Sequence, residues 1–423
     1  MLPKEDNERL TQVGPGTPMG NVFRRYWLPA LLSSELKDKD GAPVRVRLLG
    51  ENLVAFRDTT GAVGLVDAYC AHRRAPLFLG RNEKAGLRCV YHGWKFDRTG
   101  QCTDMPTEPK ESSYKERIKL KAYPTWEGGE IIWAYMGPLP APPPPDYELV
   151  RAPATHRFAS RTVQDCNYLQ ALEGGLDASH ATILHNMTLG DMSWLDDFER
   201  TTPKLDVRST DYGFEYSGIR NLKGRHWVRV YQYVMPATQI RGRIAPVRGE
   251  KEAPRVPLIA GHFWVPVDDV TVSVFNFFYS ADPAIAIDRS YIMEQEAAYG
   301  RGPDDLRPDL RLKKSLANDF LIDRDVQRTH TFSGISGVNT QDVAVQEGMG
   351  PIVDRSQEHL GSTDRAIVTM RRLLLEAVRT VEAGGAPKGA DPSTYRAMRA
   401  VDHFVDSETA IPDLIARERV ARF

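Results

Sequence analysis

Two pairs of cysteine and histidine in the first third of the chain have the spacing of metal ligands. Cys70 and His72 follow the strand-like run GLVDAY, and Cys89 and His92 follow the turn-forming residues RNEKAG. Each short spacing lets one loop present a thiolate and an imidazole together, so the two loops offer four ligands. Four cysteines in 423 residues are too few for a disulfide scaffold. The residue types therefore indicate a metal centre.

Two kinds of centre use two cysteines and two histidines. Tetrahedral zinc is one, but zinc-finger patterns usually pair cysteine with cysteine and histidine with histidine along the chain. A [2Fe–2S] cluster of the Rieske type places both cysteines on one iron and both histidines on the other, which suits loops that supply one of each. We predict the iron–sulfur cluster and keep zinc as the alternative. Cys102 and Cys166 have no such neighbours and are expected to be packing residues.

A second group of candidate ligands lies between residues 177 and 185. Asp177 and His180 are three residues apart and would share one face of a helix. His185 follows five residues later, an advance of about 500° in an ideal helix, so it joins His180 at one metal only if the helix ends or bulges between them. Two imidazoles and one carboxylate on one face form a typical mononuclear iron site, with positions open for dioxygen.

Three aspartates could complete that site from later in the chain: Asp319, Asp323 and Asp342. Spacing alone does not choose among them. Each has an ordinary alternative role as a carboxylate at the start of a helix, where it interacts favourably with the helix dipole.

The chain has the pattern of two domains of an α+β protein. Short strand-like runs between residues 44 and 136 (VRVRLLG, NLVAFRD, VGLVDAY and EIIWAYMG) predict a small all-β domain. The proline-rich segment 138–148 cannot continue a helix or a central strand, so we place the boundary there. Beyond it, residues 165–185 favour a helix, residues 205–280 favour strands, and residues 363–385 predict a further helix for packing or oligomerisation. The expected division is an extension over 1–25, a β domain over 26–140 and a larger domain over 141–423.

Composition argues against two classes of partner. The formal net charge is −1 and the pI is about 6.8, so the chain has no excess of positive charge to attract nucleic acid or anionic lipid. The chain contains no run of about 18 apolar residues, which a membrane-spanning helix would need. The first ten residues are polar, whereas a signal peptide has an apolar stretch. We expect a cytoplasmic protein that binds neither nucleic acid nor membranes.

Several motifs resemble one enzyme family over nearly the whole chain. CAHRRAPL and CVYHGWKFD are similar to the C-x-H-R and C-x-x-H-G-W motifs of Rieske domains, and Pro106 lies in the region of their third, covering loop. The pattern D-x-x-H-x-x-x-x-H after Asn167-Tyr168 resembles the catalytic domain of the same proteins. VGPGTPMG near the start and QEGMGPIVDRSQEHLGSTD near the end extend the likeness. The sequence resembles the oxygenase (alpha) subunits of Rieske non-haem iron aromatic ring-hydroxylating oxygenases, in the phthalate 4,5-dioxygenase-like group.

This resemblance implies a fold and a set of ligands. The fold would be an N-terminal all-β Rieske [2Fe–2S] domain followed by a helix-grip (START-like) catalytic domain with an antiparallel sheet and helices. His180, His185 and Asp342 would hold a mononuclear non-haem Fe(II), with Asp323 as the second choice for the carboxylate. Asp177 would bridge His180 to His92 of a neighbouring subunit and carry electrons between subunits, in a homotrimer or homohexamer.

The resemblance also implies an activity. The chain would be the terminal oxygenase that hydroxylates, by dioxygenation, an aromatic carboxylate such as phthalate, using O2 and electrons from NADH through a flavin and iron–sulfur reductase. An O-demethylase or monooxygenase acting on an aryl ether or methoxybenzoate is the alternative, and a non-catalytic Rieske electron carrier is the second. Residues proposed to contact substrate are Ser179, Arg208 and Arg243, with Arg220 and Arg241 in the same segment. Phe275, Phe277 and Phe278 are expected to fill the core rather than line the pocket.

Overall fold

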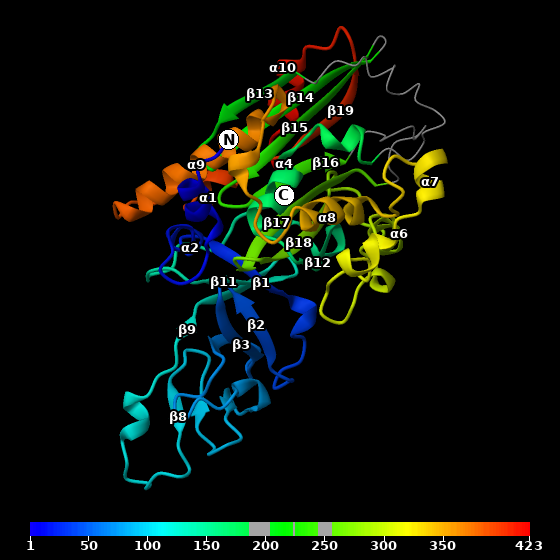
Figure 1. Ribbon diagram of the computed structural model, residues 1–423. Helices are drawn as coiled ribbons and strands as arrows, with labels where there is room; N and C mark the ends of the chain where they lie inside the picture. Colours follow the sequence, from blue (N-terminus) through cyan, green and yellow to red (C-terminus); the bar gives the residue numbers. More distant parts are fainter. Residues whose placement is uncertain (186–203, 223–224, 244–255) are drawn as a thin grey trace.

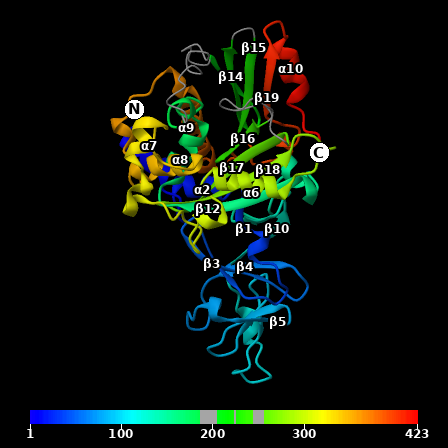
Figure 2. The same cartoon turned by 90° about the vertical axis from the view of Figure 1, so that its right-hand side faces the viewer.

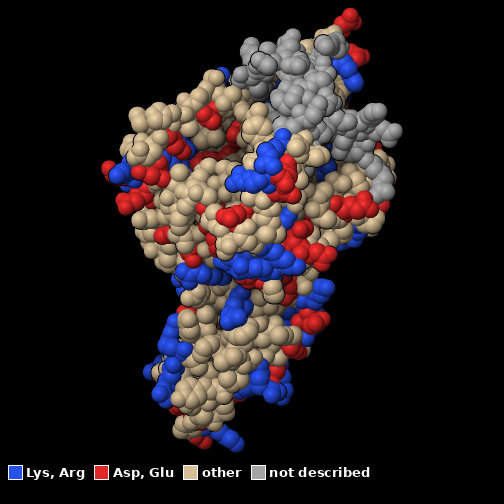
Figure 3. Space-filling model, turned by 45° about the vertical axis from the view of Figure 1, so that its right-hand side comes forward, with Lys and Arg blue, Asp and Glu red and all other residues tan. Residues whose placement is uncertain are grey.

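The computed structural model describes residues 1–185, 204–222, 225–243 and 256–423. A narrow β-rich part extends from a broader part that is built on one large sheet (Figure 1). The view turned by 90° has the same two parts (Figure 2). Figure 3 shows acidic and basic side chains interspersed on both parts, in keeping with the net charge of −1.

Small antiparallel sheets form the narrow part, with the strand orders β1-β11-β10, β2-β3-β4-β9 and β5-β6-β7-β8. All four strand-like runs predicted between residues 44 and 136 are confirmed as strands or parts of strands. In β2, exposed and buried side chains alternate, which is the period expected of a half-buried strand. The strands are β1 (Trp27–Leu32), β2 (Val44–Leu48), β3 (Glu51–Arg57), β4 (Val63–Asp67), β5 (Arg81–Glu83), β6 (Gly86–Arg88), β7 (Lys95–Phe96), β8 (Cys102–Asp104), β9 (Ala122–Tyr123), β10 (Thr125–Gly128) and β11 (Ile131–Tyr135).

The proline-rich segment connects the two parts without regular structure. Neither a helix nor a strand is formed from residue 136 to residue 147, and helix α3 (Glu148–Arg151) begins directly after it. Prolines lack the backbone N–H that helices and central strands need, which explains the irregular connector. The domain boundary within it stays a prediction.

One antiparallel sheet dominates the broad part, with the order β12-β18-β17-β16-β15-β14-β13 and β19 paired to β15. The predicted combination of an antiparallel sheet with helices is therefore confirmed. The strands are β12 (Arg157–Gln164), β13 (Lys204–Ser209), β14 (Gly213–Leu222), β15 (Arg225–Val234), β16 (Thr238–Arg243), β17 (Leu258–Asp268), β18 (Thr271–Ser280) and β19 (Val401–Asp406).

Helices α4, α8 and α9 lie together over one face of this sheet (Figure 1). The N-terminal helices α1 and α2 pack against α9, so residues 1–25 contact the broad part. The predicted C-terminal helix is confirmed as α9, and the carboxylate of its N-cap residue, Asp364, accepts from the Gly361 N–H and makes no capping hydrogen bond to the helix. Among the described residues, no helix is both long and apolar enough to cross a bilayer. The remaining helices have the bounds α1 (Lys4–Thr11), α2 (Pro18–Phe23), α4 (Tyr168–Leu176), α6 (Arg289–Ala298), α7 (Arg324–Thr329), α8 (Val338–Gly348), α9 (Arg365–Glu382) and α10 (Ile411–Glu418).

A buried ion-pair network anchors α4 to α9. Glu173 on α4 accepts hydrogen bonds from Arg371 on α9, at 2.6 Å, and from Arg355, at 2.8 Å. Arg355 is fully buried and Arg371 is 5% exposed. Because an unpaired charge at these positions would be strongly destabilising, the network holds the C-terminal end of α4 in place. The second group of candidate ligands begins at that end.

Two candidate metal centres

The two cysteine–histidine loops have the same backbone construction. The Cys70 N–H donates to the Ala75 carbonyl and the Cys70 carbonyl accepts from the Arg74 N–H, both at 2.9 Å. In the second loop the Cys89 N–H donates to the Trp94 carbonyl at 2.9 Å, and the Cys89 carbonyl accepts from the Gly93 N–H at 3.0 Å. Arg74 and Gly93 take equivalent left-handed positions, with φ of 58° and 77°. Each cysteine therefore begins a closed turn that presents the histidine within it.

Gly93 has a second reason to be glycine. A Cβ atom there would lie 2.6 Å from Cγ of Pro106, so the segment that carries Pro106 lies directly against the second loop. This is the position expected of the covering segment.

The side chains of the two loops converge on one buried place. Cys70 and Cys89 are 1% and 2% exposed, and the rings of His72 and His92 lie 4.4 Å apart. The His72 ring also stacks on Trp94, with centroids 4.5 Å apart. Burial, together with the adjacent Cys89 thiol, raises the pKa of Cys70 to about 11.

This donor set fits the predicted cluster. The Nδ1 atoms of His72 and His92 are buried and have no hydrogen-bond partner among the residues that the structure describes. Buried polar atoms without a partner are rare and call for an unseen ligand. Two buried thiols beside two such nitrogens match the cysteine and histidine ligands of a Rieske [2Fe–2S] cluster.

The second centre is built where α4 ends. The helix stops at Leu176, and Asp177 is its C-cap. The chain then forms the short 3-10 helix η5 (His180–Thr182) before it reaches His185. The predicted break between His180 and His185 is confirmed, because η5 ends at Thr182. The expectation that Asp177 and His180 share one helix face is wrong, because α4 ends before Asp177 and His180 begins a separate 3-10 turn.

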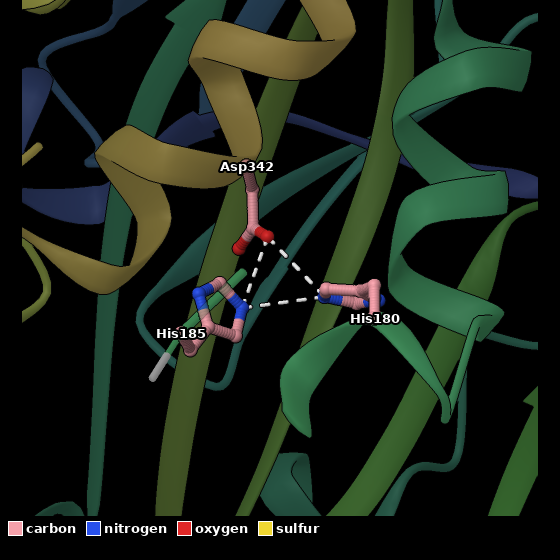
Figure 4. Close-up of side chains that lie close together, drawn as sticks. All are labelled: His180, His185 and Asp342. Atoms are coloured by element: carbon pink, nitrogen blue, oxygen red, sulfur yellow. Dashed lines mark hydrogen bonds and ion pairs between the residues drawn. The ribbon is translucent and has the colours of Figure 1, made fainter. Parts of the chain in front are cut away.

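Three ligand atoms meet at that point (Figure 4). His180 Nε2 lies 3.2 Å from His185 Nε2 and 3.3 Å from Oδ1 of Asp342. His185 Nε2 lies 3.1 Å from the same carboxylate oxygen. An octahedral ion with bonds of about 2.1 Å separates neighbouring ligand atoms by about 3.0 Å. The three atoms therefore fit one face of such an ion.

Polar side chains orient both imidazoles. His185 Nδ1 lies 2.7 Å from Oε1 of Gln341, and the Gln341 amide nitrogen donates to the Ile335 carbonyl at 2.7 Å. The Gln341 oxygen must therefore face His185, which places the proton on Nδ1 and leaves the Nε2 lone pair for a metal. The carboxylate of Asp177 faces the other imidazole, with Oδ2 3.4 Å from Nδ1 of His180, and this ion-pair contact favours a proton on that nitrogen.

The electrostatics of the site favour positive charge between the carboxylates. Burial alone would lower the pKa of His180, but the carboxylates of Asp177 and Asp342 raise it to about 10. Burial alone would raise the pKa of Asp342, yet the imidazoles of His185 and His180 hold it far below its usual range. The Asp342 and His180 side chains remain 19% and 24% exposed, so the ligand atoms are not sealed off.

The other two candidate carboxylates lie elsewhere. Asp323 is the N-cap of α7 and accepts from the amides of Asp325 and Val326, each at 2.9 Å. Asp319 is exposed and has a φ of 51°. The structure brings Asp342 to the histidines, and Asp323 does the ordinary work of a capping residue.

Comparison with known proteins decides the family. Residues 26–124 match the family described as Rieske [2Fe-2S] domain, and residues 134–410 match the family described as LigXa C-terminal domain like. The phthalate 4,5-dioxygenase oxygenase subunit of Pseudomonas putida is 37% identical over 428 residues, which cover 95% of this chain and 92% of that protein. The chain belongs to the Rieske oxygenase family.

Two further proteins are similar to this chain over most of its length. The 5,5'-dehydrodivanillate O-demethylase oxygenase subunit of Sphingobium sp. is 35% identical over 413 residues, which cover 94% of this chain and 86% of that protein. The crystal structure of dicamba monooxygenase bound to dicamba has the same fold, with a TM-score of 0.60 at 19% identity over 85% of this chain and 98% of that one. The chain is thus an oxidoreductase with a Rieske [2Fe–2S] domain. The match over residues 134–410 argues against a simple electron carrier, which would not need that part.

The arginines proposed for substrate have different positions. Arg208 is exposed and pairs with Glu215 at 2.7 Å, on the sheet face opposite to Tyr216 and the iron site, so the expectation that it walls the pocket is corrected. Arg243 points to the site face, but its guanidinium donates to the Tyr299 hydroxyl and the Gln295 side chain.

Arg220 and Ser179, which were also predicted near the substrate, contact the loop that carries the iron ligands. Arg220 donates to the Ala178 carbonyl at 2.9 Å, so it tethers the loop between Asp177 and His180. Ser179 lies beside His180, and its backbone N–H donates to Asp177 at 2.6 Å.

The aromatic residues of β18 are confirmed as core residues. Phe275, Phe277 and Phe278 are each 1% exposed. Cys102 and Cys166 are also buried, as expected of packing residues.

Sequence reasoning missed a set of buried or half-buried polar residues beside the iron site: Gln341, Asn339, Arg301, Asn276 and His262. These residues come from four separate elements or loops, and none has a spacing that links it to the ligands. Only Gln341 carried a usable signal, since it directly precedes Asp342.

Proposed function

We propose that this Rieske oxygenase is the terminal oxygenase of a system that hydroxylates an aromatic carboxylate, such as phthalate, by dioxygenation. The observation that carries the proposal is the convergence of His180, His185 and Asp342 on one point. Two imidazoles and one carboxylate leave the opposite face of an octahedral Fe(II) for dioxygen and substrate. An electron carrier would have no use for this site.

The chain's own residues have distinct tasks in this proposal. When bound, a [2Fe–2S] cluster at Cys70, His72, Cys89 and His92 supplies single electrons, and Fe(II) at the triad supplies dioxygen activation. Gln341 and Asp177 keep the two imidazoles in the tautomer that offers Nε2. Arg220 holds the connecting loop in place.

Arg241 is our candidate for the substrate carboxylate. It lies on β16, on the same sheet face as Gln239, whose side chain reaches the Gly175 carbonyl of α4 at 2.6 Å. Among the residues that the structure describes, Arg241 has no carboxylate partner. Burial lowers the pKa of Arg241, and the nearby guanidinium groups of Arg229 and Arg301 lower it further.

The two arginines near Arg241 each have a carboxylate close by. Arg301 pairs with Glu296 at 2.6 Å, and Arg229 lies 3.5 Å from Asp402. The half-buried guanidinium of Arg241 is available to an anion, and its planar fork suits an aromatic carboxylate. An anionic substrate thus fits this surface better than a neutral one.

Electrons would cross between subunits. The two loops lie at the far end of the narrow part from α8 in both ribbon views (Figures 1 and 2), so one chain does not bring its own two centres together. Asp177 is 24% exposed, with one oxygen held by Ser179 and the other facing His180. A carboxylate oxygen can accept more than one hydrogen bond, so Asp177 could also accept one from His92 of a second copy. That bond would come from Nε2 of His92, because its Nδ1 would bind the cluster.

Exposed apolar side chains support such an assembly. Leu79, Val90 and Tyr91, beside the cluster loops, are each more than half exposed. Ile183, between the two iron histidines, and Met349, at the end of α8, are 44% and 50% exposed. Contact between the cluster loops of one copy and the iron-site face of the next would cover both sets. We propose a homotrimer, or a homohexamer of two such rings, with a small aromatic substrate and a cytoplasmic flavin and iron–sulfur reductase that uses NADH.

O-demethylation of an aryl ether is the second candidate, because one relative is named an O-demethylase. The same iron site and the same electron path would serve both reactions.

The test is turnover of phthalates, benzoates and methoxybenzoates with O2, NADH and a reductase, scoring oxygen uptake coupled to product. We expect ring hydroxylation of an aromatic acid, and formaldehyde release would indicate demethylation. His180→Ala should keep a reducible cluster and lose all product. Product formed by that variant, or turnover of another substrate class with no aromatic acid accepted, would overturn the proposal.

A further inference from the structure

His262 lies on the sheet face that carries the proposed iron site. In the register of β16 and β17 it is directly opposite Gln239, whose side chain reaches the α4 backbone. Directly opposed residues point to the same face, so His262 also points toward α4. Arg241 is its diagonal neighbour, because Arg241 is opposite Ala260, two residues before His262. Diagonal neighbours are about 7–8 Å apart, a span that one substituted benzene ring can bridge.

The position of the proton on His262 follows from its neighbours. His262 Nδ1 lies 2.8 Å from Oδ1 of Asn276, and the same oxygen accepts from Arg301 Nη1 at 2.8 Å. A guanidinium only donates, so the oxygen of the Asn276 amide, and not its nitrogen, must face Arg301. That oxygen can only accept from His262. Nδ1 therefore carries the proton, and Nε2 has a lone pair.

His262 stays neutral in these surroundings. Burial lowers the pKa of His262 well below its usual value, and the charges of Arg241 and Arg301 lower it further. The ring is 4% exposed, and Nε2 has no hydrogen-bond partner within the described part of the chain. A neutral imidazole nitrogen is an acceptor, so Nε2 can take a hydrogen bond from a donor outside the protein.

A chain of hydrogen bonds links this acceptor to the iron site. The Asn339 side-chain oxygen accepts from Arg301 at 3.0 Å, and its amide nitrogen donates to Oδ2 of Asp342 at 3.3 Å. Together with Asn276, these residues form an unbroken path from Asp342 to His262. The charge of Asp342 also acts on His262. The acceptor thus belongs to the surroundings of the reacting centre.

We propose that Nε2 of His262 accepts a hydrogen bond from the substrate, so that the preferred aromatic carboxylate also carries a phenolic hydroxyl. The inference rests on the proposed function and narrows its substrate class to hydroxybenzoates, including methoxylated ones. Arg241 binds the carboxylate, and His262 binds the hydroxyl at another position of the ring. A second carboxylate or a methoxy group in that place has no hydrogen to donate. Nε2 of His262 would then have no hydrogen-bond donor.

The experiment compares ligands that differ in one group. Anaerobic calorimetry on the iron-loaded protein measures binding of benzoate, the three hydroxybenzoates, the corresponding methoxybenzoates and phthalate. A single turnover of dithionite-reduced protein with O2 then tests each acid without a reductase. We expect at least one hydroxybenzoate to bind about tenfold more tightly than both benzoate and its methoxy counterpart.

Three variants assign that preference to His262. His262→Leu should remove it, and His262→Gln, which keeps an acceptor, should retain part of it. Asn276→Asp is nearly isosteric but places a carboxylate against Nδ1, which favours the imidazolium and turns Nε2 into a donor. The preference should then shrink or reverse in favour of methoxybenzoate and phthalate. Unchanged iron content and an unchanged Rieske spectrum show that each variant is folded.

The possible results distinguish the role of His262 from the proposed oxygenase function. Aromatic acids that bind and turn over equally with and without a hydroxyl would overturn the role of His262 and leave the proposed function standing. So would a hydroxyl preference that survives in His262→Leu. A protein that binds and oxidises none of the acids would overturn both.

Discussion

Gln341 and His185 are joined by a 2.7 Å hydrogen bond between the amide oxygen of one and Nδ1 of the other. Gln341 directly precedes Asp342 on α8, while His185 follows the break after α4. One residue pair therefore ties together the two segments that supply the proposed iron ligands. The amide is itself fixed by its bond to the Ile335 carbonyl.

Replacing Gln341 should weaken iron binding without touching the cluster. In Gln341→Leu, His185 loses the acceptor that fixes its tautomer and ring orientation, and such outer contacts are worth about 10–100-fold in metal affinity. Fe(II) titration of the metal-depleted site measures the loss, and the Rieske absorption spectrum serves as the control. Gln341→Glu keeps an acceptor beside Nδ1 and should lose less. Equal iron affinity in Gln341→Leu and the parent protein would contradict this role.

Iron uptake should release a proton from His180. Because Asp177 and Asp342 raise the pKa of His180 to about 10, the metal-free protein carries a proton there at neutral pH, which Fe(II) must displace. Iron affinity should therefore fall about tenfold for each pH unit between about pH 8 and 6.5, with close to one proton released per ion. Titration in weakly buffered solution measures both quantities.

Asp177→Asn provides the matched control for that measurement. Without its carboxylate the pKa of His180 falls toward the ordinary value, so fewer protons should be released at neutral pH. An affinity that is flat with pH in the parent protein would show that His180 is already neutral before iron binds.

The sequence was most informative where ligands are close in the chain. The spacings within the cluster loops identified four residues that the structure brings to one buried place. The five-residue interval from His180 to His185 demanded a break in the helix between them, and the short helix η5 ends at Thr182. In both cases the local backbone decides the geometry, so local spacing is sufficient.

Spacing failed where the fold brings distant segments together. Asp342 could be preferred over Asp323 only through a family resemblance, because nothing local reveals that α8 crosses the end of α4. Arg208 was proposed to wall the pocket, but it lies on the other face of the sheet, because the side of a strand residue depends on a register that the sequence alone does not fix. His262 looked like any histidine in an apolar strand, and its surroundings come from other strands and loops.

Arg241 should govern affinity for the acid group of the substrate. Arg241→Gln removes the guanidinium that has no carboxylate of its own among the described residues, and a charge-assisted pair of this kind is worth about 10–100-fold in binding. Calorimetry with an aromatic acid and with its neutral amide separates the charge from the ring: only the acid should bind more weakly. Arg243→Gln is the matched control, because Arg243 is engaged by Tyr299 and Gln295. A larger loss in the control would move the carboxylate site to Arg243.

Asp177 should matter more for electron transfer than for either metal, because the loss of its contact with His180 can be offset by loading the variant with excess Fe(II). Asp177→Asn is expected to keep a reducible cluster and most of its iron, yet lose product formation by at least about 100-fold, because the link from His180 to the neighbouring copy is broken. Spectroscopy of the cluster, iron analysis and a single-turnover assay make that distinction.

Subunit mixing tests whether the path runs between copies. A Cys89→Ser subunit lacks a competent cluster but keeps Asp177, while an Asp177→Asn subunit keeps its cluster. When the two are assembled together, the intact cluster of one meets the intact Asp177 of the other, so activity should return although each variant alone is inactive. Within a single chain both variants remain broken, and no mixture would help. If verified mixed oligomers have no activity, electrons travel within one subunit. The proposal that the ring assembly carries electrons between subunits would then be wrong.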